Sequence, residues 1–252
     1  ESSVTSLRTS ESLTKVLDLF DEDVDDLIEY LRSPANLEIV RVYALENTGS
    51  GMAPFYILLS LYASGTLSTG LLRAHVKRRN DLPELSTTES FLGRYFIFFI
   101  IGQFTTLLTA LGLLYYIGIQ CYSPFQFWLA SAVTSMVFTL LNYGLVYAFG
   151  NLGEALAIVI LVIQVPGSGG TYPIQMLPDF FQKLYPYMPF KFAMAALRET
   201  VAGPTEGVYQ KNMLILLGIA IALVPISIIL AKLYKPILKF FEDSKSKTKL
   251  MH

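Results

Sequence analysis

Hydrophobic residues in this chain gather in long runs that short polar segments separate. Runs of spanning length predict four helices, over about residues 52–72, 95–117, 125–149 and 213–234. A helix needs about 20 residues to cross the hydrocarbon core of a bilayer. A fifth, interrupted run covers about residues 154–172. The pattern therefore predicts an all-α integral membrane protein with five transmembrane helices in residues 52–235.

The fifth run is too short to span a membrane without interruption. Its continuous apolar part, Ala155–Val165, has 11 residues. The break and the segment after it contain Pro166, Gly167, Gly169, Gly170, Pro173, Pro178, Pro186 and Pro189. Irregular backbone at membrane depth is tolerated only against protein or a water-filled cavity. Because hydrophobic residues continue to Leu197, we predict a broken helix and a re-entrant external segment over residues 171–203. In the alternative interpretation, the helix ends at Pro166 and a surface loop follows.

The first 33 residues are polar overall but carry one apolar stripe. Its members are Leu13, Leu17, Phe20, Val24, Leu27 and Leu31, at alternating spacings of four and three. This spacing predicts a helix that packs along a single seam, on another copy or on a helix of the same chain. A β-branched and aromatic segment at 37–45 predicts a short strand, and residues 47–51 predict a turn. Residues 1–51 are thus expected to be the helix-plus-strand end of an external domain.

Composition places the chain in the membrane class and excludes most catalytic chemistry. Of its 252 residues, 53% are hydrophobic and 15% are charged, whereas soluble domains carry about 25% charge. A single cysteine, Cys121, and two histidines, His75 and His252, give no disulfide framework, metal cluster or catalytic triad. The glycines at 167–170 lack the lysine of a phosphate-binding loop. We therefore expect no enzyme, no cofactor and no nucleic-acid partner.

An acidic run, Asp21–Asp26, resembles the start of a calcium-binding loop only in part. Asp26 stands where such a loop needs glycine, and Arg32 where it needs glutamate. The run is better interpreted as the solvated face of a helix.

Charge is unevenly distributed and orients the predicted spans. Residues 1–50 hold 11 acids and 4 bases, whereas residues 73–94 hold 5 bases and 3 acids, and residues 232–252 hold 6 bases and 2 acids. Cytoplasmic loops carry an excess of Lys and Arg, which places the 73–94 loop and the 236–252 tail in the cytoplasm. Five alternating spans then put the acidic start outside. An upstream membrane helix or signal is expected to have carried it across, which would give six spans in a longer chain.

Charged and amide side chains supply the candidate functional residues. The cytoplasmic candidates are Arg73, Lys77, Arg78, Arg79 and Glu154. The four bases form either a coupling surface for a separate ATPase or a topology signal with anionic-lipid contacts. Glu154 either pairs with a loop arginine or is a solvated carboxylate at a helix N-terminus. The external pair Arg198 and Glu199 belongs to an outer gate or is an interfacial ion pair. Helix–helix hydrogen bonds are the common explanation for Gln103, Asn142 and Gln164.

Several ordered motifs resemble a known family. They are Asn47-Thr-Gly-Ser-Gly-Met-Ala-Pro54, Gly169-Gly-Thr-Tyr-Pro173-Ile-Gln-Met-Leu-Pro178, Tyr185-Pro-Tyr-Met-Pro189 and Ala196-Leu-Arg-Glu199. Together they resemble the C-terminal membrane region of the YhgE/Pip (phage infection protein) family, over about residues 46–240. Residues 1–45 match no motif of that family.

The resemblance implies an architecture similar to the permease of type-2 ABC exporters. It implies one upstream transmembrane helix, a large external domain and five further helices, in a homodimer of the Gram-positive plasma membrane. The implied roles are a phage receptor that binds a phage tail protein through the external domain, or a membrane component of secretion similar to EsaA of type VII systems. The alternative is the transmembrane subunit of an exporter driven by a separate ATPase.

Overall fold

The computed structural model describes residues 45, 47–72, 74, 86–170, 174–203 and 207–248, with side chains described as far as residue 234. By its internal contacts the chain divides into Glu1–Val42 and Tyr43–His252, and all described residues belong to the second unit. The predicted seam Leu13–Leu31, the acidic run, residues 37–44 of the predicted strand, and Arg73, Lys77, Arg78 and Arg79 lie outside the described residues.

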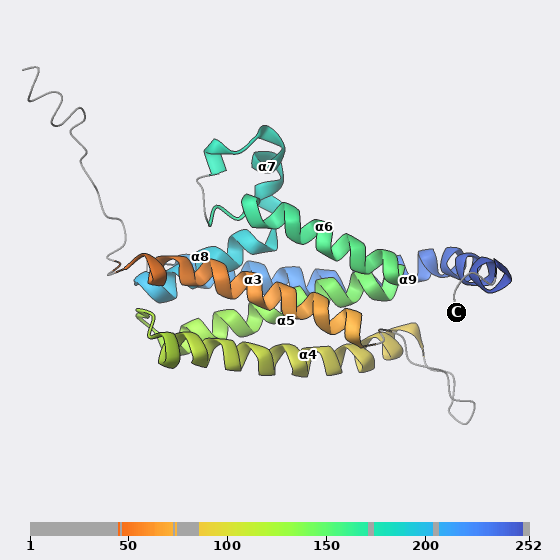
Figure 1. The fold of residues 1–252 in the computed structure, drawn as a ribbon, viewed down its shortest axis with the longest axis horizontal. Coiled ribbons are helices and arrows are strands. Elements are labelled where there is room, and N and C mark those ends of the chain that lie inside the picture. Colours follow the sequence, from red (N-terminus) through yellow and green to blue (C-terminus); the bar gives the residue numbers. More distant parts are fainter. Residues whose placement is uncertain are drawn as a thin grey trace, which may run out of the picture. The chain divides into compact units, whose positions relative to one another are not determined.

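All secondary structure in the described residues is helical (Figure 1). The elements are α3 (Thr48–Leu71), α4 (Thr87–Leu111) with the π-helical turn η1 (Gly112–Ile117), α5 (Pro124–Phe149), α6 (Asn151–Gly167), the 3₁₀ turn η2 (Ile174–Met176), α7 (Asp179–Leu184), the 3₁₀ turn η3 (Tyr185–Tyr187), α8 (Pro189–Ala202) and α9 (Val208–Thr248). The all-helical part of the fold prediction is confirmed for these residues.

Helix starts differ in two places from the sequence-based expectation. Residues 48–51, predicted as a turn, form the first turn of α3, because Oδ1 of Asn47 accepts a hydrogen bond from the Ser50 amide at 2.8 Å and caps the helix. Helix α4 begins at Thr87, eight residues before the start of the predicted span 95–117. The Ser86 amide donates to Glu89 Oε2 at 2.8 Å, which is one half of a capping box.

At one end of the bundle, the start of α3 lies beside the α4–α5 connection and the end of α8. The Gln120 amide donates to Ser50 Oγ at 2.9 Å, and the Ser123 amide donates to the Thr200 carbonyl at 3.1 Å. We call this the Ser50 end.

At the opposite end, the end of α3 lies beside the start of α6, and the end of α5 beside the start of α4. A Cβ placed on Gly70 would lie 2.5 Å from Glu154 Oε1. The Tyr147 hydroxyl donates to the Thr87 carbonyl at 3.5 Å. We call this the Glu154 end. The two ends show that α3, α4, α5 and α6 run alternately up and down.

Helix α5 is the centre of the bundle. It packs against α3, α4, α6, α8 and α9. In its most apolar 18-residue stretch, 72% of the residues are buried, against 22% in α4 and 28% in α9. Buried positions of α5 include Ser131, Thr134, Ser135, Thr139 and Asn142. Ser131 and Thr139 donate to carbonyls of α5 itself, whereas Ser135 and Asn142 donate to carbonyls of α4 and α3. Polar groups therefore lie inside the bundle, and two of them link α5 to a neighbouring helix.

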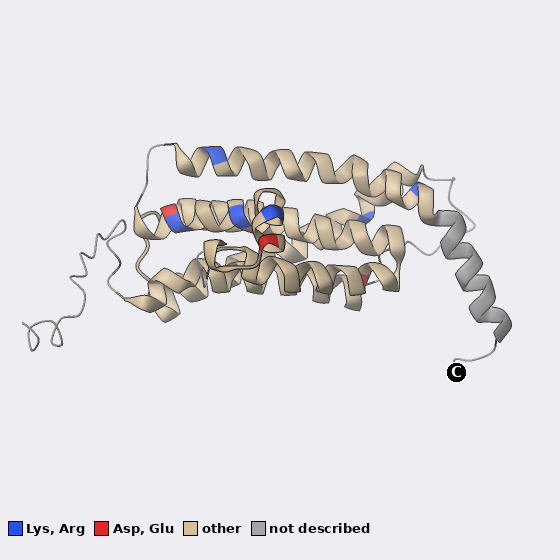
Figure 2. Cartoon of the chain, turned by 90° about the horizontal axis from the view of Figure 1, so that it is seen from above, with Lys and Arg blue, Asp and Glu red and all other residues tan. Residues whose placement is uncertain are grey.

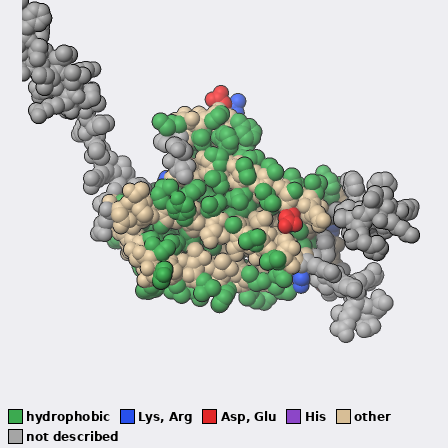
Figure 3. All heavy atoms as spheres, in the orientation of Figure 1, with side chains coloured by type: hydrophobic (Ala, Val, Ile, Leu, Met, Phe, Trp, Pro, Cys, Tyr) green, Lys and Arg blue, Asp and Glu red, His purple; other side chains and the backbone are tan. Residues whose placement is uncertain are grey.

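The outer helices expose large apolar side chains instead. On α4 and η1 these are Leu92, Phe96, Ile97, Ile100, Phe104, Leu107, Leu108, Leu111, Tyr115, Tyr116 and Ile117, and on α9 they are Leu214, Leu217, Ile221, Ile226, Ile229 and Leu233. Figure 3 shows hydrophobic side chains across the middle of one face, and Figure 2 shows long stretches of helix without charge. Such an apolar exterior is expected of a protein whose solvent is lipid.

Among the described helices, α4 with η1, α5 and α9 are long and apolar enough to cross a membrane. Helix α6 is apolar but shorter, with 17 residues. Helix α3 is rich in small and hydroxyl residues, and it is largely buried. The prediction of five spans is therefore met by three helices, and it stays a prediction that α3 and α6 also cross the membrane.

Aromatic rings fill the contact between α4 and α5. Phe91 and Phe98 both lie against Tyr143, with ring centroids 4.9 Å apart in each pair. The Tyr143 hydroxyl donates to the Phe91 carbonyl at 3.1 Å. Pairs of this kind contribute about 0.5–1.5 kcal/mol beyond the area they bury, so this cluster fixes α4 on the central helix.

Candidate functional site

Helix α6 ends at Gly167, one residue beyond Pro166. At about 1.5 Å per residue its 17 residues are about 26 Å long, shorter than the hydrocarbon core of about 30 Å. Gly169 then has φ +66°, which is the left-handed region that glycine adopts without steric cost. The chain thus turns away from the helix axis before α6 has the length of a span. Pro173 lies outside the described residues.

Two glycines of the break are needed because other residues approach them closely. A Cβ on Gly167 would lie 2.8 Å from Met188 Sδ, and one on Gly170 would lie 2.7 Å from Phe55 Cδ2. Both distances are too short for a larger residue without movement of its neighbour. The break is therefore packed between α3 and the residue that precedes α8.

Arg198, on α8, satisfies backbone carbonyls of the break. Its guanidinium donates to the Gly169 carbonyl at 2.9 Å and to the Gly170 carbonyl at 3.4 Å. Its positive charge also lies at the C-terminal end of α6, where the helix dipole favours cations. Ser168 Oγ donates to the Val165 carbonyl at 2.8 Å. Buried carbonyls without a donor are costly, so Arg198 holds the break in its conformation.

Glu199, the second member of the predicted charged pair, is buried at 3% exposure on α8. Lys191, one turn into α8, lies over the Tyr185 ring at 4.5 Å from its centroid. Cations in this position are attracted to the face of the ring. Glu199 and Lys191 thus both pack against other residues of the folded protein.

After the break the chain leaves the side of the bundle and then returns to it. Figure 1 shows α7 to one side of α6 and α8. Pro178 precedes α7, Pro186 lies in η3, and Pro189 is the first residue of α8. Each of these prolines falls at a helix start or in a short turn, where a missing amide proton costs little.

Helix α8 then runs outward from the middle of the bundle. At its start, Phe190 stacks on Phe138 near the middle of α5, with 5.5 Å between ring centroids. At its end, the Thr200 carbonyl accepts from the Ser123 amide, just before α5 begins. This path has the shape of a re-entrant segment, although its depth in a membrane stays a prediction.

The three amide side chains expected at membrane depth differ in their contacts. Gln103 Nε2 donates to the Ala132 carbonyl at 3.1 Å and links α4 to α5. Asn142 Nδ2 donates to the Tyr62 carbonyl at 3.3 Å and to Thr66 Oγ1 at 3.2 Å, which links α5 to α3. For these two residues the expected helix–helix hydrogen bonds are confirmed.

For Gln164 the same expectation is wrong. Its side chain is 3% exposed, and its Oε1 accepts no hydrogen bond from the described residues. It lies on α6 two residues before Pro166, where the chain is about to leave the bundle.

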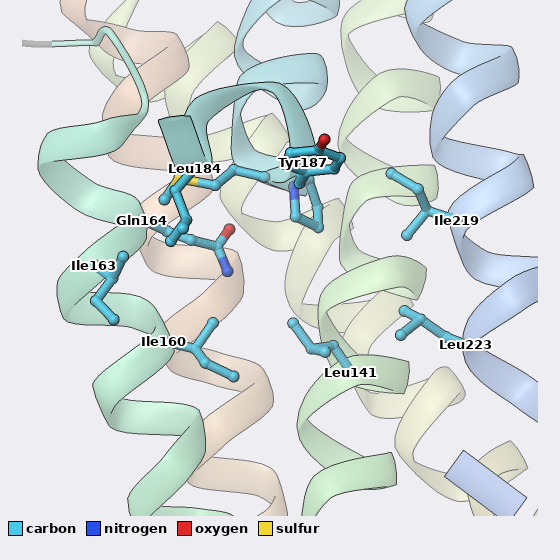
Figure 4. Close-up of a pocket in the computed structure, with 10 residues that line it drawn as sticks. Leu141, Ile160, Ile163, Gln164, Leu184, Tyr187, Ile219 and Leu223 are labelled. Atoms are coloured by element: carbon cyan, nitrogen blue, oxygen red, sulfur yellow. The ribbon is translucent and has the colours of Figure 1, made fainter. Parts of the chain in front are cut away.

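Gln164 instead faces a cavity of about 330 Å³ (Figure 4). Leu141 of α5 lies at one side, Ile160 and Ile163 of α6 at another, and Ile219 and Leu223 of α9 opposite, while Leu184, Tyr187, Met188 and Pro189 cover it. Helices α6 and α9 both pack on α5 but have little contact with each other. The cavity is therefore partly open between them, at the side of the bundle. Sequence reasoning missed it; a lone amide in the last turn before a helix break was the available signal.

Of the predicted cytoplasmic candidates, the structure describes Glu154. Its half-buried carboxylate packs against Gly70 at the end of α3. The helix ends that flank residues 73–85, at Leu72 and Ser86, lie at the same Glu154 end. Among the described residues no group of three His, Cys, Asp or Glu side chains could hold a metal ion.

A central helix with buried polar side chains, an apolar exterior and several helices long enough to cross a bilayer together indicate a polytopic membrane protein. The chain belongs to the ABC-2 family of transporter proteins, whose family model matches residues 11–229. It is also 28% identical over 190 residues to the YhgE protein of Bacillus subtilis (strain 168), an alignment that covers 74% of this chain and 24% of YhgE. The chain thus spans about a quarter of that relative's length. The resemblance stated from the sequence motifs is confirmed.

Proposed function

We propose that this chain is the membrane-spanning part of an exporter that a separate ATPase drives. Membership of the ABC-2 transporter family makes the chain a membrane transport component. The proposal of a separate ATPase is supported by the arrangement of the Glu154 end, where both predicted cytoplasmic connections leave the bundle. The basic 73–86 connection joins α3 to α4 and residue 150 joins α5 to α6, so one protein bound there would contact four helices.

The proposed membrane domain has five spans, α3, α4, α5, α6 and α9. Helix α3 is less apolar than the others because neighbouring helices bury much of it, and α6 is short because the chain breaks off after Gly167. The Glu154 end and the C-terminal tail face the cytoplasm of a bacterial cell, and the Ser50 end faces outward. This orientation follows from the excess of Lys and Arg in residues 73–94 and 232–252.

Purification from bacterial membranes tests the ATPase proposal. We expect an ATP-hydrolysing subunit to accompany the chain, and the double substitution Arg78→Glu with Arg79→Glu to abolish the association by reversing the charge of the surface. The matched control is Lys245→Glu with Lys247→Glu in the tail, which changes the net charge equally. Equal association in both variants would contradict the proposed coupling surface, and absence of any ATPase would contradict an ATP-driven exporter.

A second proposal is that the domain anchors an external receptor or secretion component. It is supported by the length of YhgE, about three quarters of which lies outside the part aligned with this chain. A phage tail protein would then bind upstream of the membrane domain. Cells carrying the full-length protein should adsorb the phage, whereas cells carrying residues 43–252 alone should not. Adsorption by the membrane domain alone would contradict this arrangement.

We also propose a homodimer, supported by the wide apolar exterior of α4, α6 and α9. The predicted seam Leu13–Leu31 would contribute a second contact between the copies. Cysteine cross-linking along that seam in native membranes should give a dimer band. Cross-links confined to one copy would instead assign the seam to a helix of the same chain.

A further inference from the structure

Three buried side-chain oxygens have no hydrogen-bond partner among the described residues: Thr134 Oγ1, Asn142 Oδ1 and Gln164 Oε1. Of these three residues, Gln164 lines a cavity. Gln103 and the amide nitrogen of Asn142 donate to neighbouring helices, as their positions between packed helices allow. Gln164 is buried to the same degree as a core residue, at 3% exposure, but its Oε1 accepts no hydrogen bond from the described residues. An acceptor in this state costs about 1–3 kcal/mol of desolvation relative to a satisfied one. A group outside the described chain that donates to Oε1 would recover that free energy.

We propose that the cavity beside Gln164 binds the apolar chain of a neutral amphiphile whose hydroxyl or amide group donates a hydrogen bond to Gln164 Oε1. Figure 4 shows the amide directed into the space between α6, α5 and α9. Binding at this cavity requires neither an ATPase nor transport of the bound molecule.

The lining excludes other classes of occupant. Nine of the ten lining residues are Leu, Ile, Met, Pro or Tyr, and none is charged. An ordered water needs two to four polar partners, and one amide cannot supply them throughout a space of this size. A charged group would be desolvated without a counter-ion, at a large cost. A plain hydrocarbon chain would fill the space but leave Oε1 without a donor.

The size and position of the cavity fit a chain that enters from the bilayer. A water-sized or methylene-sized group occupies about 30 Å³, so about 330 Å³ accommodates on the order of ten such groups. Helices α6 and α9 have little contact with each other, and each exposes an apolar side chain one turn from a lining residue: Val159 beside Ile163 on α6 and Ile226 beside Leu223 on α9. A chain can therefore slide from lipid into the cavity without crossing water.

Tyr187 stands at the rim of this opening. It is 82% exposed, and in Figure 4 its ring lies over the cavity while its hydroxyl points away. The ring therefore offers an apolar face to a bound chain and leaves Gln164 as the polar anchor of the site. The polar group of the ligand is then expected beside the last turn of α6, with its chain extending toward Leu223.

Photolabelling of the purified protein in phosphatidylcholine–phosphatidylglycerol vesicles tests the proposal. The probe is a diazirine-bearing hexadecanol, and the matched probe is its methyl ether, which has the same chain but no donor. We expect the alcohol to label residues of α6 or α9 at a half-saturating concentration about tenfold lower than the ether. In Gln164→Leu, the alcohol should lose this advantage and behave like the ether.

Two further variants keep the result interpretable. Gln103→Leu removes an intramembrane amide away from the cavity and should leave the alcohol's advantage intact. Leu223→Trp should reduce labelling by both probes because the larger side chain fills the cavity, and Ile163→Trp fills it from the opposite helix if Leu223→Trp does not fold. Equal labelling of the native protein by both probes would overturn the proposal, as would a preference for the alcohol that survives Gln164→Leu. Labelling confined to peptides that contain none of the lining residues would overturn the assigned location.

Discussion

A buried amide side chain lies in the α3–α5 contact and another on the side of α5 that faces α6 and α9, but only the first joins two helices. Between α3 and α5, Gly65 lets the helices approach until Asn142 Nδ2 reaches the Tyr62 carbonyl and Thr66 Oγ1. Between α6 and α9 the helices stay apart, and Gln164 faces a cavity of about 330 Å³. Backbone approach, which glycine controls, therefore decides whether an amide joins two helices or remains available to a ligand.

The two sides of α5 also differ in the contacts that hold them together. The α3–α5 contact is filled by side chains that are fully buried, including Leu58, Tyr62 and Phe138. The α6 side depends on a packed break, two close glycines and the hydrogen bonds of Arg198. The α3–α5 contact therefore depends on apolar packing, and the break depends on a few specific contacts.

The largest loss of stability is expected when a larger side chain forces α3 and α5 apart. Gly65→Leu would place a side chain where a Cβ alone already lies 2.8 Å from Asn142 Nδ2. Overpacking of this kind should lower the free energy of unfolding by about 3 kcal/mol, measured by denaturant titration in detergent. The matched control is Gly218→Leu on α9, where nothing lies within 4 Å of the position of a Cβ. A large loss of stability in Gly218→Leu, or no loss in Gly65→Leu, would contradict the claim that Gly65 is needed for the close approach of α3 and α5.

A smaller and more local effect is expected at the break. Arg198→Ala leaves the Gly169 and Gly170 carbonyls without their donor, and hydrogen bonds to a charged group contribute about 1.5–3 kcal/mol. We expect a loss of about 2 kcal/mol, with faster amide hydrogen exchange in residues 174–190 and little change in α5. Arg198→Lys keeps the charge but lacks the guanidinium Nη2 that donates to both carbonyls, so its stability should lie between those of the native protein and Arg198→Ala. Uniformly faster exchange across the bundle would show that Arg198 stabilises the whole fold and has no specific effect on the break.

Helix positions were largely predictable from the sequence. The predicted spans 95–117, 125–149 and 213–234 fall within α4 with η1, α5 and α9. Long apolar runs bounded by turn residues give such helices directly, because every backbone group is satisfied inside the helix itself. The interruption near Pro166 was also predictable, since proline and glycine act locally, although α6 ends at Gly167 and the predicted run continued to 172.

Contacts between distant segments were not predictable in the same way. The sequence placed Arg198 in an outer gate or in an interfacial ion pair, and no local pattern indicated that its guanidinium donates to the Gly169 and Gly170 carbonyls, 29 and 28 residues earlier in the chain. The cavity depends on how far α6 stands from α9, and no local pattern encodes that distance. Asn142 and Gln164 look alike in the sequence, and only the packing around them gives them different roles.

Asn142→Leu tests the amide of the closed contact. The substitution removes the hydrogen bonds to the Tyr62 carbonyl and Thr66 Oγ1 while keeping a similar volume. Interhelical hydrogen bonds in membrane proteins contribute about 0.6–2 kcal/mol, so we expect a loss of about 1 kcal/mol in detergent titrations. An unchanged stability would mean that packing at Gly65 carries the contact and that the amide adds nothing.

Gln164→Leu is expected to change stability least, and the sign of the change is the informative part of this prediction. In detergent without a long-chain alcohol, the substitution removes an acceptor that has no partner among the described residues and replaces it with a side chain that suits the apolar lining. Removing an unsatisfied buried group is neutral or stabilising, so we expect a change between zero and a gain of roughly 0.5 kcal/mol. A loss equal to that of Asn142→Leu would show that Gln164 also joins two helices, and the contrast between the two sides of α5 would disappear.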